Sequence, residues 1–265
     1  MLSVCATPIG NLEDVTLRVL RELREADVIL CEDTRHTRVL LGRYDIRATL
    51  LSYHEHNEAK RTAEILPRLL AGERVALVSD AGMPGISDPG ARLIAAALEA
   101  GAPVTVLPGP SAVETALVAS GLVGERYQFV GYLPRGEKAL ASLWRELARW
   151  QWPVVAFESP RRLPRTLRSL AAALPGRDVA VCRELTKRFE EVVRGTAEEL
   201  AVRFAEPPKG EIVLVLGGAE IVVDEAAGAE AVAELVRAGL ARRQAAELVA
   251  RLTGASRNAL FKRSL

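Results

Sequence analysis

Short apolar runs alternate with longer amphipathic stretches along the first 121 residues. The runs 28–31 and 75–78 are typical, because each is apolar throughout and is followed at once by polar or turn-forming residues. Such runs predict buried parallel strands, and apolar positions spaced three and four apart between them predict helices. The expected strands are 2–6, 28–31, 48–52, 75–78 and 104–107, and the expected helices are 12–26, 57–71, 90–100 and 112–120. This alternation predicts a doubly wound α/β domain over residues 1–121.

The pattern restarts after a turn-rich patch at 121–126, which predicts a second α/β domain over residues 122–218. No helix-like stretch separates the strands expected at 179–183 and 191–194, so these two are predicted to pair antiparallel. The other expected strands are 128–131, 154–158 and 211–216, and the expected helices are 137–149, 164–173 and 196–205.

Residues 225–265 predict a separate helical extension, with helical sequence from 229 to 265 and a break at Thr253 and Gly254. The whole chain carries a net charge of +1, but the stretch from 237 to 265 has seven basic residues and one acid, Glu247. This asymmetry and the helix-turn-helix cadence indicate an anionic partner such as RNA. The predicted phosphate contacts are Arg257, Lys262 and Arg263. The alternative is a solvated basic hairpin that caps a dimer or the second domain.

Composition narrows the class of protein. With 265 residues and 49% apolar content the chain predicts a well-packed globular protein. No signal peptide and no membrane-spanning run is expected, and three scattered cysteines predict a reducing, cytoplasmic setting without disulfides. His54 and His56 have no third ligand near them in sequence, so a solvated loop is expected and no metal site.

Two glycine- and proline-rich turns follow expected strands of the first domain. VALVSDAGMPGISDPG spans 75–90 and VTVLPGPSA spans 104–112. Ligands of open α/β sheets bind beyond the carboxyl ends of the strands, so these turns predict a ligand site, with an ordinary surface loop as the alternative. Neither turn has the spacing of a triphosphate- or dinucleotide-binding loop. Ser111 could also serve only as a helix N-cap.

Seven motifs in order carry a family resemblance over residues 3–217. They are ATPIGNLEDVTLR at 6–18, CEDTR at 31–35, SDAGMPGISDPG at 79–90, LPGPSA at 107–112, GYLPR at 131–135, FESPRR at 157–162 and RELTKRFEE at 183–191. Together they resemble the tetrapyrrole methylase superfamily, and within it the branch that methylates the ribose 2'-oxygen of a cytidine in the decoding region of 16S ribosomal RNA. The resemblance implies two α/β domains with S-adenosylmethionine in the cleft between them, and a homodimer.

The resemblance also implies which residues hold the methyl donor, largely through backbone groups on these turns. They are Pro8, Asp80, Met83, Ile86, Ser87, Ser111, Ala112, Leu133 and Glu158. The chain departs from the tetrapyrrole enzymes at two turns. It has Ala6-Thr7-Pro8-Ile9-Gly10-Asn11 in place of their G-x-G-P-G-D, and Asp80-Ala81-Gly82 in place of Gly-Asp-Pro. Both departures fit the RNA branch.

Methyl transfer from a sulfonium is an in-line displacement, so positioning is the main requirement and no metal is needed. A ribose hydroxyl is a weak nucleophile, and a carboxylate or a lysine can assist loss of its proton. Asp33 and Lys187 are the predicted catalytic residues, because CEDTR and RELTK most resemble the RNA branch. The alternatives are a helix N-cap for Asp33 and a phosphate contact for Lys187.

The expected partner is 16S ribosomal RNA or the 30S subunit. The arginines expected to line an RNA path are Arg35, Arg135, Arg161 and Arg162, although each could be ordinary surface. Two other hypotheses remain open at this point: a methyltransferase that acts on a tetrapyrrole precursor, and a non-catalytic RNA-binding factor of ribosome assembly.

Overall fold

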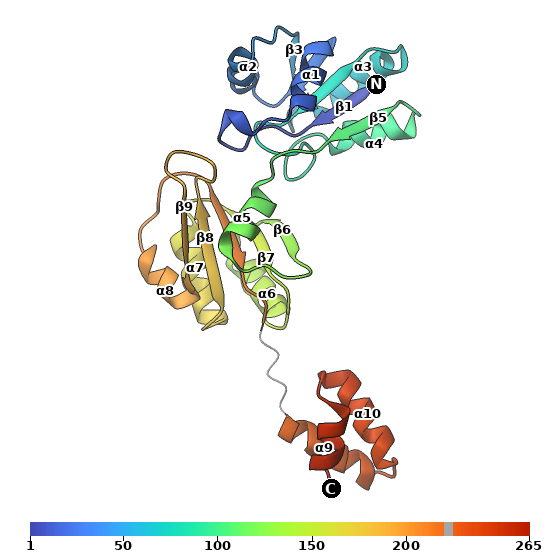
Figure 1. Ribbon diagram of the computed structural model, residues 1–265, viewed down its shortest axis with the longest axis vertical. Helices are drawn as coiled ribbons and strands as arrows, with labels where there is room; N and C mark the ends of the chain where they lie inside the picture. Colours follow the sequence, from blue (N-terminus) through green and yellow to red (C-terminus); the bar gives the residue numbers. More distant parts are fainter. Residues whose placement is uncertain (220–224) are drawn as a thin grey trace. The chain divides into compact units, whose positions relative to one another are not determined.

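The computed structural model of the chain describes residues 1–219 and 225–265. Residues 1–219 form one compact unit, and the described residues of the C-terminal part form a second (Figure 1). The first unit contains two five-stranded sheets with helices, and the second is entirely helical. In the described residues no helix has the length and apolarity that a membrane crossing requires.

The first sheet is entirely parallel, with the strand order β3-β2-β4-β1-β5. Its strands are β1 (Leu2–Cys5), β2 (Val28–Cys31), β3 (Leu50–Ser52), β4 (Val75–Val78) and β5 (Val104–Leu107). The expected doubly wound sheet is confirmed. Because β1 lies between β4 and β5, the loops that follow these three strands emerge side by side at the carboxyl edge.

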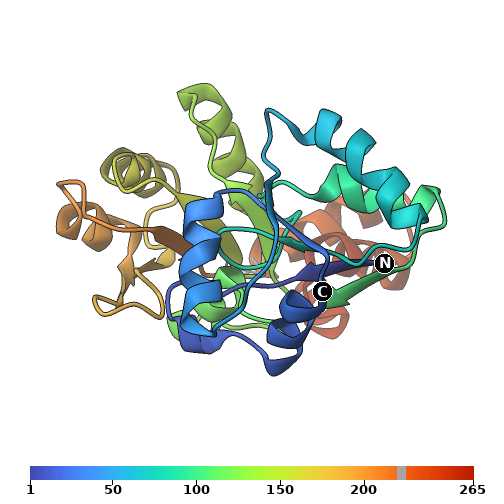
Figure 2. The same ribbon diagram turned by 90° about the horizontal axis from the view of Figure 1, so that it is seen from above.

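Helices cover both faces of the first sheet, as Figure 2 shows from above. One face packs against α1 (Leu17–Glu25) and α2 (Thr34–Arg43), and the other against α3 (Glu58–Leu70) and α4 (Ala91–Glu99). The prediction of a single helix at 12–26 is wrong. A 3-10 turn, η1 (Leu12–Asp14), comes first, and α1 starts afresh because the Thr16 hydroxyl accepts a hydrogen bond from the Val19 N–H.

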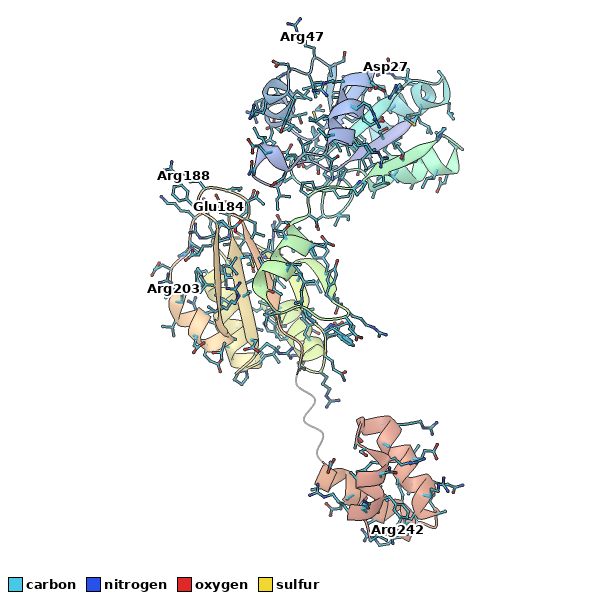
Figure 3. All side chains as sticks on the ribbon, viewed as in Figure 1. Asp27, Arg47, Glu184, Arg188, Arg203 and Arg242 are labelled. Atoms are coloured by element: carbon cyan, nitrogen blue, oxygen red, sulfur yellow. The ribbon has the colours of Figure 1, made fainter. Side chains whose placement is uncertain are left out.

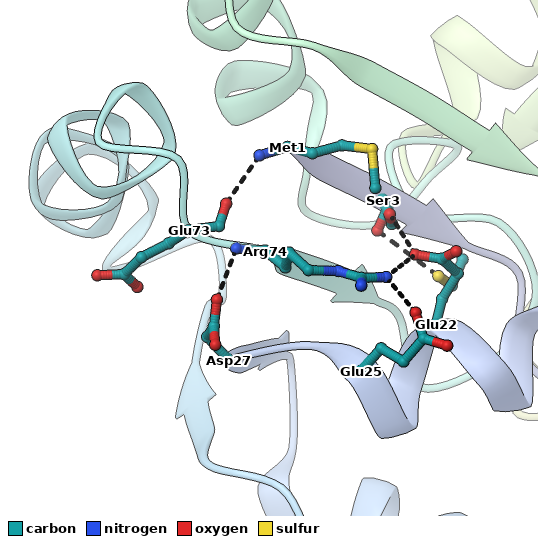
Figure 4. A network of polar contacts seen from close by, with 8 residues as sticks. Met1, Ser3, Glu22, Glu25, Asp27, Glu73 and Arg74 are labelled. Carbon is teal, nitrogen blue, oxygen red and sulfur yellow. Dashed lines mark hydrogen bonds and ion pairs between the residues drawn. The ribbon is translucent and has the colours of Figure 1, made fainter.

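A polar network fastens the amino edge of this sheet, opposite the loops (Figure 4). The Arg74 guanidinium lies 2.6 Å from the Glu25 carboxylate and 3.5 Å from that of Glu22. The Arg74 N–H donates to Asp27, and the Ser3 hydroxyl donates to Glu22. These contacts tie α1 to the strands at the edge where no ligand loop lies.

The second sheet is mixed, with the strand order β6-β7-β10-β8-β9. Its strands are β6 (Gln128–Tyr132), β7 (Val154–Glu158), β8 (Asp178–Arg183), β9 (Glu191–Thr196) and β10 (Ile212–Leu216). The β8–β9 pair is antiparallel, with Cys182 opposite Val192, which confirms the prediction made from the missing helix. The helices α6 (Glu137–Leu147), α7 (Leu163–Ala173) and α8 (Ala197–Arg203) cover one face.

The other face of the second sheet is covered by α5 (Ala112–Ser120), a helix that precedes the expected domain boundary in sequence. Its Val113, Ala116 and Leu117 pack against β7, β8 and β10. The Arg194 guanidinium also donates to the Ser120 carbonyl at 2.7 Å. The chain therefore passes from one sheet to the other in the turn before α5, at 108–111.

The C-terminal unit contains α9 (Glu225–Arg237), α10 (Arg242–Thr253) and α11 (Arg257–Arg263) around a small core that includes Val232, Val249 and Leu260. The break at Gly254 is confirmed, because this residue ends α10 in the left-handed region at φ 74°. The prediction of an uninterrupted helix from 229 to that break is wrong. Gly239, at φ 99°, ends the first helix, and a left-handed glycine of this kind stops a helix without steric cost.

Candidate functional site

The loops after β1, β4 and β5 are held together at the carboxyl edge of the first sheet. Thr7 and Gly82 exchange two backbone hydrogen bonds of 2.9 and 3.0 Å, and the Thr7 hydroxyl donates to the Ser79 carbonyl. Gly109 of the third loop approaches so closely that a Cβ there would lie 2.9 Å from the Ala6 Cβ. The three loops therefore form one continuous wall.

A cavity of about 470 Å³, named here the donor cavity, lies between this wall and the second sheet. Its volume is in the range of sites for small molecules and cofactors. Seven of the nine residues predicted to hold the methyl donor line it: Asp80, Met83, Ile86, Ser87, Ser111, Ala112 and Glu158. Pro8 instead lines a neighbouring cavity, and Leu133 is buried beneath the second sheet.

Aromatic side chains of the second sheet complete the donor cavity. Tyr132 and Phe157 line it with their ring centroids 5.4 Å apart, and Phe129 stacks on Phe157 from the side at 5.0 Å. Neither lining ring was among the predicted residues. Tyr132 lies in the motif GYLPR and Phe157 in the motif FESPRR. The sequence of a strand does not show which face of the sheet its aromatic side chains occupy.

Acidic side chains give one side of the donor cavity a negative potential. Asp88 lines the cavity, and burial, reinforced by the charges of Glu32 and Asp80, raises the pKa of its carboxyl to about 6. Burial and the Asp80 charge also raise the pKa of Glu32. A cationic ligand in the cavity would relieve this repulsion.

Glu158 lines the donor cavity, and both oxygens of its carboxylate accept hydrogen bonds. Its side chain is wholly buried and accepts hydrogen bonds from the Ser159 N–H at 2.6 Å, the Thr166 hydroxyl at 2.5 Å and the Arg162 Nε at 2.7 Å. Arg162 also donates to the Leu133 carbonyl. These bonds fix the wall, and they occupy most of the Arg162 guanidinium.

Ser111 occupies the N-cap position of α5, but its side chain accepts no capping hydrogen bond. Its hydroxyl donates instead to the Glu114 carboxylate, which also accepts from the Tyr127 hydroxyl at 2.6 Å. Ser111 is therefore positioned at the donor cavity by a side-chain contact and not by capping.

A second cavity of about 450 Å³ adjoins the first. It is lined by the loop after β1, by α2 and by Lys187, and it shares Ile9, Asp80, Ala81 and Glu211 with the donor cavity. The Lys187 ammonium lies 2.9 Å from the carboxylates of both Glu184 and Glu211. Burial alone would lower the pKa of Lys187, but the two carboxylates more than offset this and hold that pKa above its usual value.

Asp33 caps α2, which is the alternative role considered for it from the sequence. Its carboxylate accepts from the Arg35 N–H at 2.8 Å and pairs with the Arg35 guanidinium at 2.7 Å. These contacts hold the pKa of Asp33 well below its usual range. The residue lines neither cavity, but its own N–H donates to the Asp80 carboxylate, which lines both.

The remaining predicted RNA contacts lie on the surface. Arg135 and Arg161 are exposed in the first unit, and Arg257 and Lys262 in the second, where Arg263 pairs with Glu225 at 2.7 Å. The three cysteines are buried and free. Within residues 1–219 and 225–265, no group of three or more potential metal ligands comes together.

The loops of the parallel sheet and the strands of the mixed sheet line the same cavity. The chain is therefore an α/β protein with a ligand cleft between its two sheets. A match to the Tetrapyrrole (Corrin/Porphyrin) Methylases covers residues 1–201, and the chain belongs to this family. Within it the chain groups with proteins named ribosomal RNA small subunit methyltransferase I. The one from Mesorhizobium japonicum is 44% identical over all of this chain and 91% of its own length.

The relative of the same name from Thermotoga maritima is 48% identical over 220 residues, which are 83% of this chain and 99% of its own length. Among solved structures, the uroporphyrin-III C-methyl transferase of Thermus thermophilus in complex with S-adenyl homocysteine has a TM-score of 0.57. It is 18% identical and covers 82% of this chain and 96% of its own, a likeness that shows the fold.

Proposed function

We propose that this protein uses S-adenosylmethionine to methylate the ribose 2'-oxygen of a cytidine in the decoding region of 16S ribosomal RNA. The donor cavity carries this proposal, because seven residues chosen from separate motifs converge on it. The curated relatives, whose name is that of a small-subunit ribosomal RNA methyltransferase, support the acceptor.

The donor cavity fits S-adenosylmethionine in size and in charge. When bound, this cofactor supplies a methyl group on a sulfonium that is ready for in-line displacement. Asp80 and Asp88 offer carboxylates to its positive charge. The pKa of Asp88 is raised by burial and by the nearby charges of Glu32 and Asp80, and a bound cation would favour its ionised form. Tyr132 and Phe157 offer flat apolar surfaces to an adenine ring.

Lys187 and Asp33 remain the proposed catalytic residues. Lys187 is held as an ammonium at the rim of the second cavity, where it can polarise a ribose hydroxyl but cannot accept its proton. Asp33 stays ionised beside Arg35 and holds Asp80 in place through its N–H group. A low pKa makes Asp33 a weak base, so its contribution in this proposal is mainly electrostatic.

The RNA contacts are proposed on exposed arginines of both units. Arg35, Arg135 and Arg161 lie on the first unit, and the basic helices of the second carry Arg257, Lys262 and Arg263. Arg162 contributes less, because its guanidinium already binds Glu158 and Leu133. Phosphate contacts from these basic residues would position RNA without reading its sequence. The proposal also includes a homodimer that acts on the small ribosomal subunit.

The test is transfer of labelled methyl from S-adenosylmethionine to small ribosomal subunits that lack their normal modifications, with naked RNA and a tetrapyrrole precursor in parallel. We expect label on one ribose 2'-oxygen, located by mapping the nucleotide. Label on the tetrapyrrole alone would instead favour the substrate class named for the Thermus structure. RNA binding without transfer would favour a non-catalytic assembly factor.

A further inference from the structure

The second cavity adjoins the donor cavity and has the dimensions of a separate ligand site. At about 450 Å³ it is close in volume to its neighbour. The two share Ile9, Asp80, Ala81 and Glu211, so a ligand in each would meet at this border. A reaction that joins two substrates requires such a shared boundary, because the reacting atoms must come within bonding reach.

The lining of the second cavity favours a neutral polar ligand. The Lys187 ammonium has three N–H groups. Among the described residues it donates to Glu184 and to Glu211, which leaves the third N–H for a ligand oxygen. His36 at the start of α2 offers a further polar group. A carboxylated tetrapyrrole is several times larger than a nucleoside and would bring its carboxylates against Asp80 and Glu211.

The turn between β8 and β9, which carries Lys187, is built under backbone strain. Glu184 and Thr186 have φ angles of 51° and 64°, and the left-handed region is costly for a β-branched residue such as Thr186. The turn keeps this shape because the Thr186 N–H donates to Glu190 and the Thr186 hydroxyl accepts from the Asn11 N–H. Strain of this kind persists at sites where the surrounding structure holds a side chain in place for function.

The same turn presents a flat ring to solvent. Phe189 is 65% exposed, and the Arg188 guanidinium lies 5.5 Å from the centre of its ring. Figure 3 shows Glu184 and Arg188 on this turn, with Arg188 extending outward. An exposed aromatic ring beside an arginine is a stacking platform for an unpaired base of single-stranded RNA.

We propose that the second cavity is the acceptor site and receives one nucleoside of single-stranded RNA. The ribose lies toward the border at Asp80 and Glu211, and Lys187 donates to one of its oxygens. The base of an adjoining nucleotide stacks on Phe189. This inference rests on the proposed function, because it assigns to that reaction the place of its acceptor.

The test fills the second cavity without touching the first. Val39 lines the second cavity from the surface of α2 and is 60% exposed, so Val39→Trp would occupy the cavity with little cost to folding. Arg38→Trp is the matched control, because Arg38 is exposed on the same helix and lines neither cavity. Full-length proteins are compared for affinity to a fluorescent RNA hairpin of the decoding region, affinity to S-adenosylhomocysteine, and KM and kcat of methyl transfer.

We expect Val39→Trp to weaken hairpin affinity and raise the RNA KM by about tenfold or more, with S-adenosylhomocysteine affinity unchanged within about twofold. Phe189→Ala should weaken hairpin affinity by about tenfold, because the stacking platform is removed, and leave S-adenosylhomocysteine binding intact. Arg38→Trp should change neither affinity by more than about twofold.

The acceptor site is overturned if Val39→Trp keeps the wild-type hairpin affinity and KM, or if it loses S-adenosylhomocysteine to the same degree. Hairpin binding by a wild type that methylates neither the hairpin nor the small subunit contradicts the proposed function alone. In that case a selective loss of hairpin affinity in Val39→Trp still supports the cavity as the RNA site. A wild type that neither binds nor methylates the hairpin or the subunit contradicts both.

Discussion

Asp88 is an acid whose ionisation opposes folding. Its pKa of about 6 in the folded protein lies above the ordinary value of 3.8, because burial and neighbouring carboxylates disfavour the charge. The native state therefore loses stability as pH rises from about 4 to about 6, and the penalty is constant above that range.

We expect Asp88→Asn to raise the free energy of unfolding above pH 6 by about 1–2 kcal/mol, a range reduced from the full pKa shift because the side chain is partly exposed. At pH 4 the variant and the wild type should be nearly equal. Urea unfolding at pH 4 and pH 8 measures this difference. Equal stability at both values, or a larger gain at pH 4, would contradict the assigned environment of Asp88.

Gly10 marks the close approach of the loop after β1 to the β8–β9 turn. A Cβ at this position would lie 2.5 Å from the Lys187 Cγ, 2.7 Å from the Thr186 Oγ1 and 2.9 Å from the Leu185 carbonyl. Gly10→Ala should destabilise the fold by about 1–3 kcal/mol and displace Lys187, so that methyl transfer falls with it.

The matched control for Gly10→Ala is Gly42→Ala. Gly42 lies within α2, and a Cβ there would meet no atom within 4 Å. Alanine is the better helix former, so this variant should keep activity and gain up to about 1 kcal/mol of stability. Thermal unfolding and a transfer assay on both variants measure the contrast, and similar losses in the two would exclude the close approach as the cause.

At the scale of elements, Arg177 joins the end of α6 to the end of β10. Its guanidinium is 9% exposed and donates to the carbonyls of Leu147, Ala148 and Gly217, while burial lowers its pKa. Arg177→Met would leave these carbonyls without donors, so we expect a loss of about 2–4 kcal/mol in urea unfolding. Arg168→Met, at an exposed position of α7, should change stability by less than about 0.5 kcal/mol.

The bounds of the elements show how much of the secondary structure the pattern of apolar and polar residues predicted. β2, β4, β5, β7 and α5 have the bounds that the apolar runs predicted. The face on which α5 packs was beyond prediction, because a short helix with Val113 and Leu117 buried fits either sheet equally well from its sequence. The breaks at Thr16 and Gly239 were missed because caps depend on single side-chain and backbone contacts, to which periodicity is insensitive.

At the scale of the whole molecule, residues 1–219 form a compact unit of their own. The Thermotoga relative, matched over 220 residues that make up 99% of its length, is close to this unit in size. We therefore expect a protein truncated after Ala219 to fold and to bind S-adenosylhomocysteine as tightly as the full chain.

The truncated protein should bind RNA more weakly and with a smaller dependence on salt. Removal of one phosphate contact reduces the slope of log affinity against log salt by about 0.7–0.9. Filter binding of a decoding-region fragment between low and moderate salt measures the slopes of the truncated and full-length proteins. An unchanged slope would show that Arg257, Lys262 and Arg263 contact no phosphate.

The sequence by itself determined the family, most of the strands and the two glycine- and proline-rich turns that line the donor cavity, because apolar runs and turn residues act locally and each motif occupies a continuous stretch of the chain. Six of the residues proposed to hold the methyl donor line one cavity from the loops after β4 and β5, since parallel strands bring their carboxyl ends to one edge, and Glu158 lines it from the second sheet. Only the tertiary structure decided that α5 covers the second sheet, that the Asp33 N–H binds the Asp80 carboxylate and that Lys187 borders a second cavity with Asp80 and Glu211. These features depend on contacts between segments far apart in the chain, and no local pattern records which partner a side chain meets after folding.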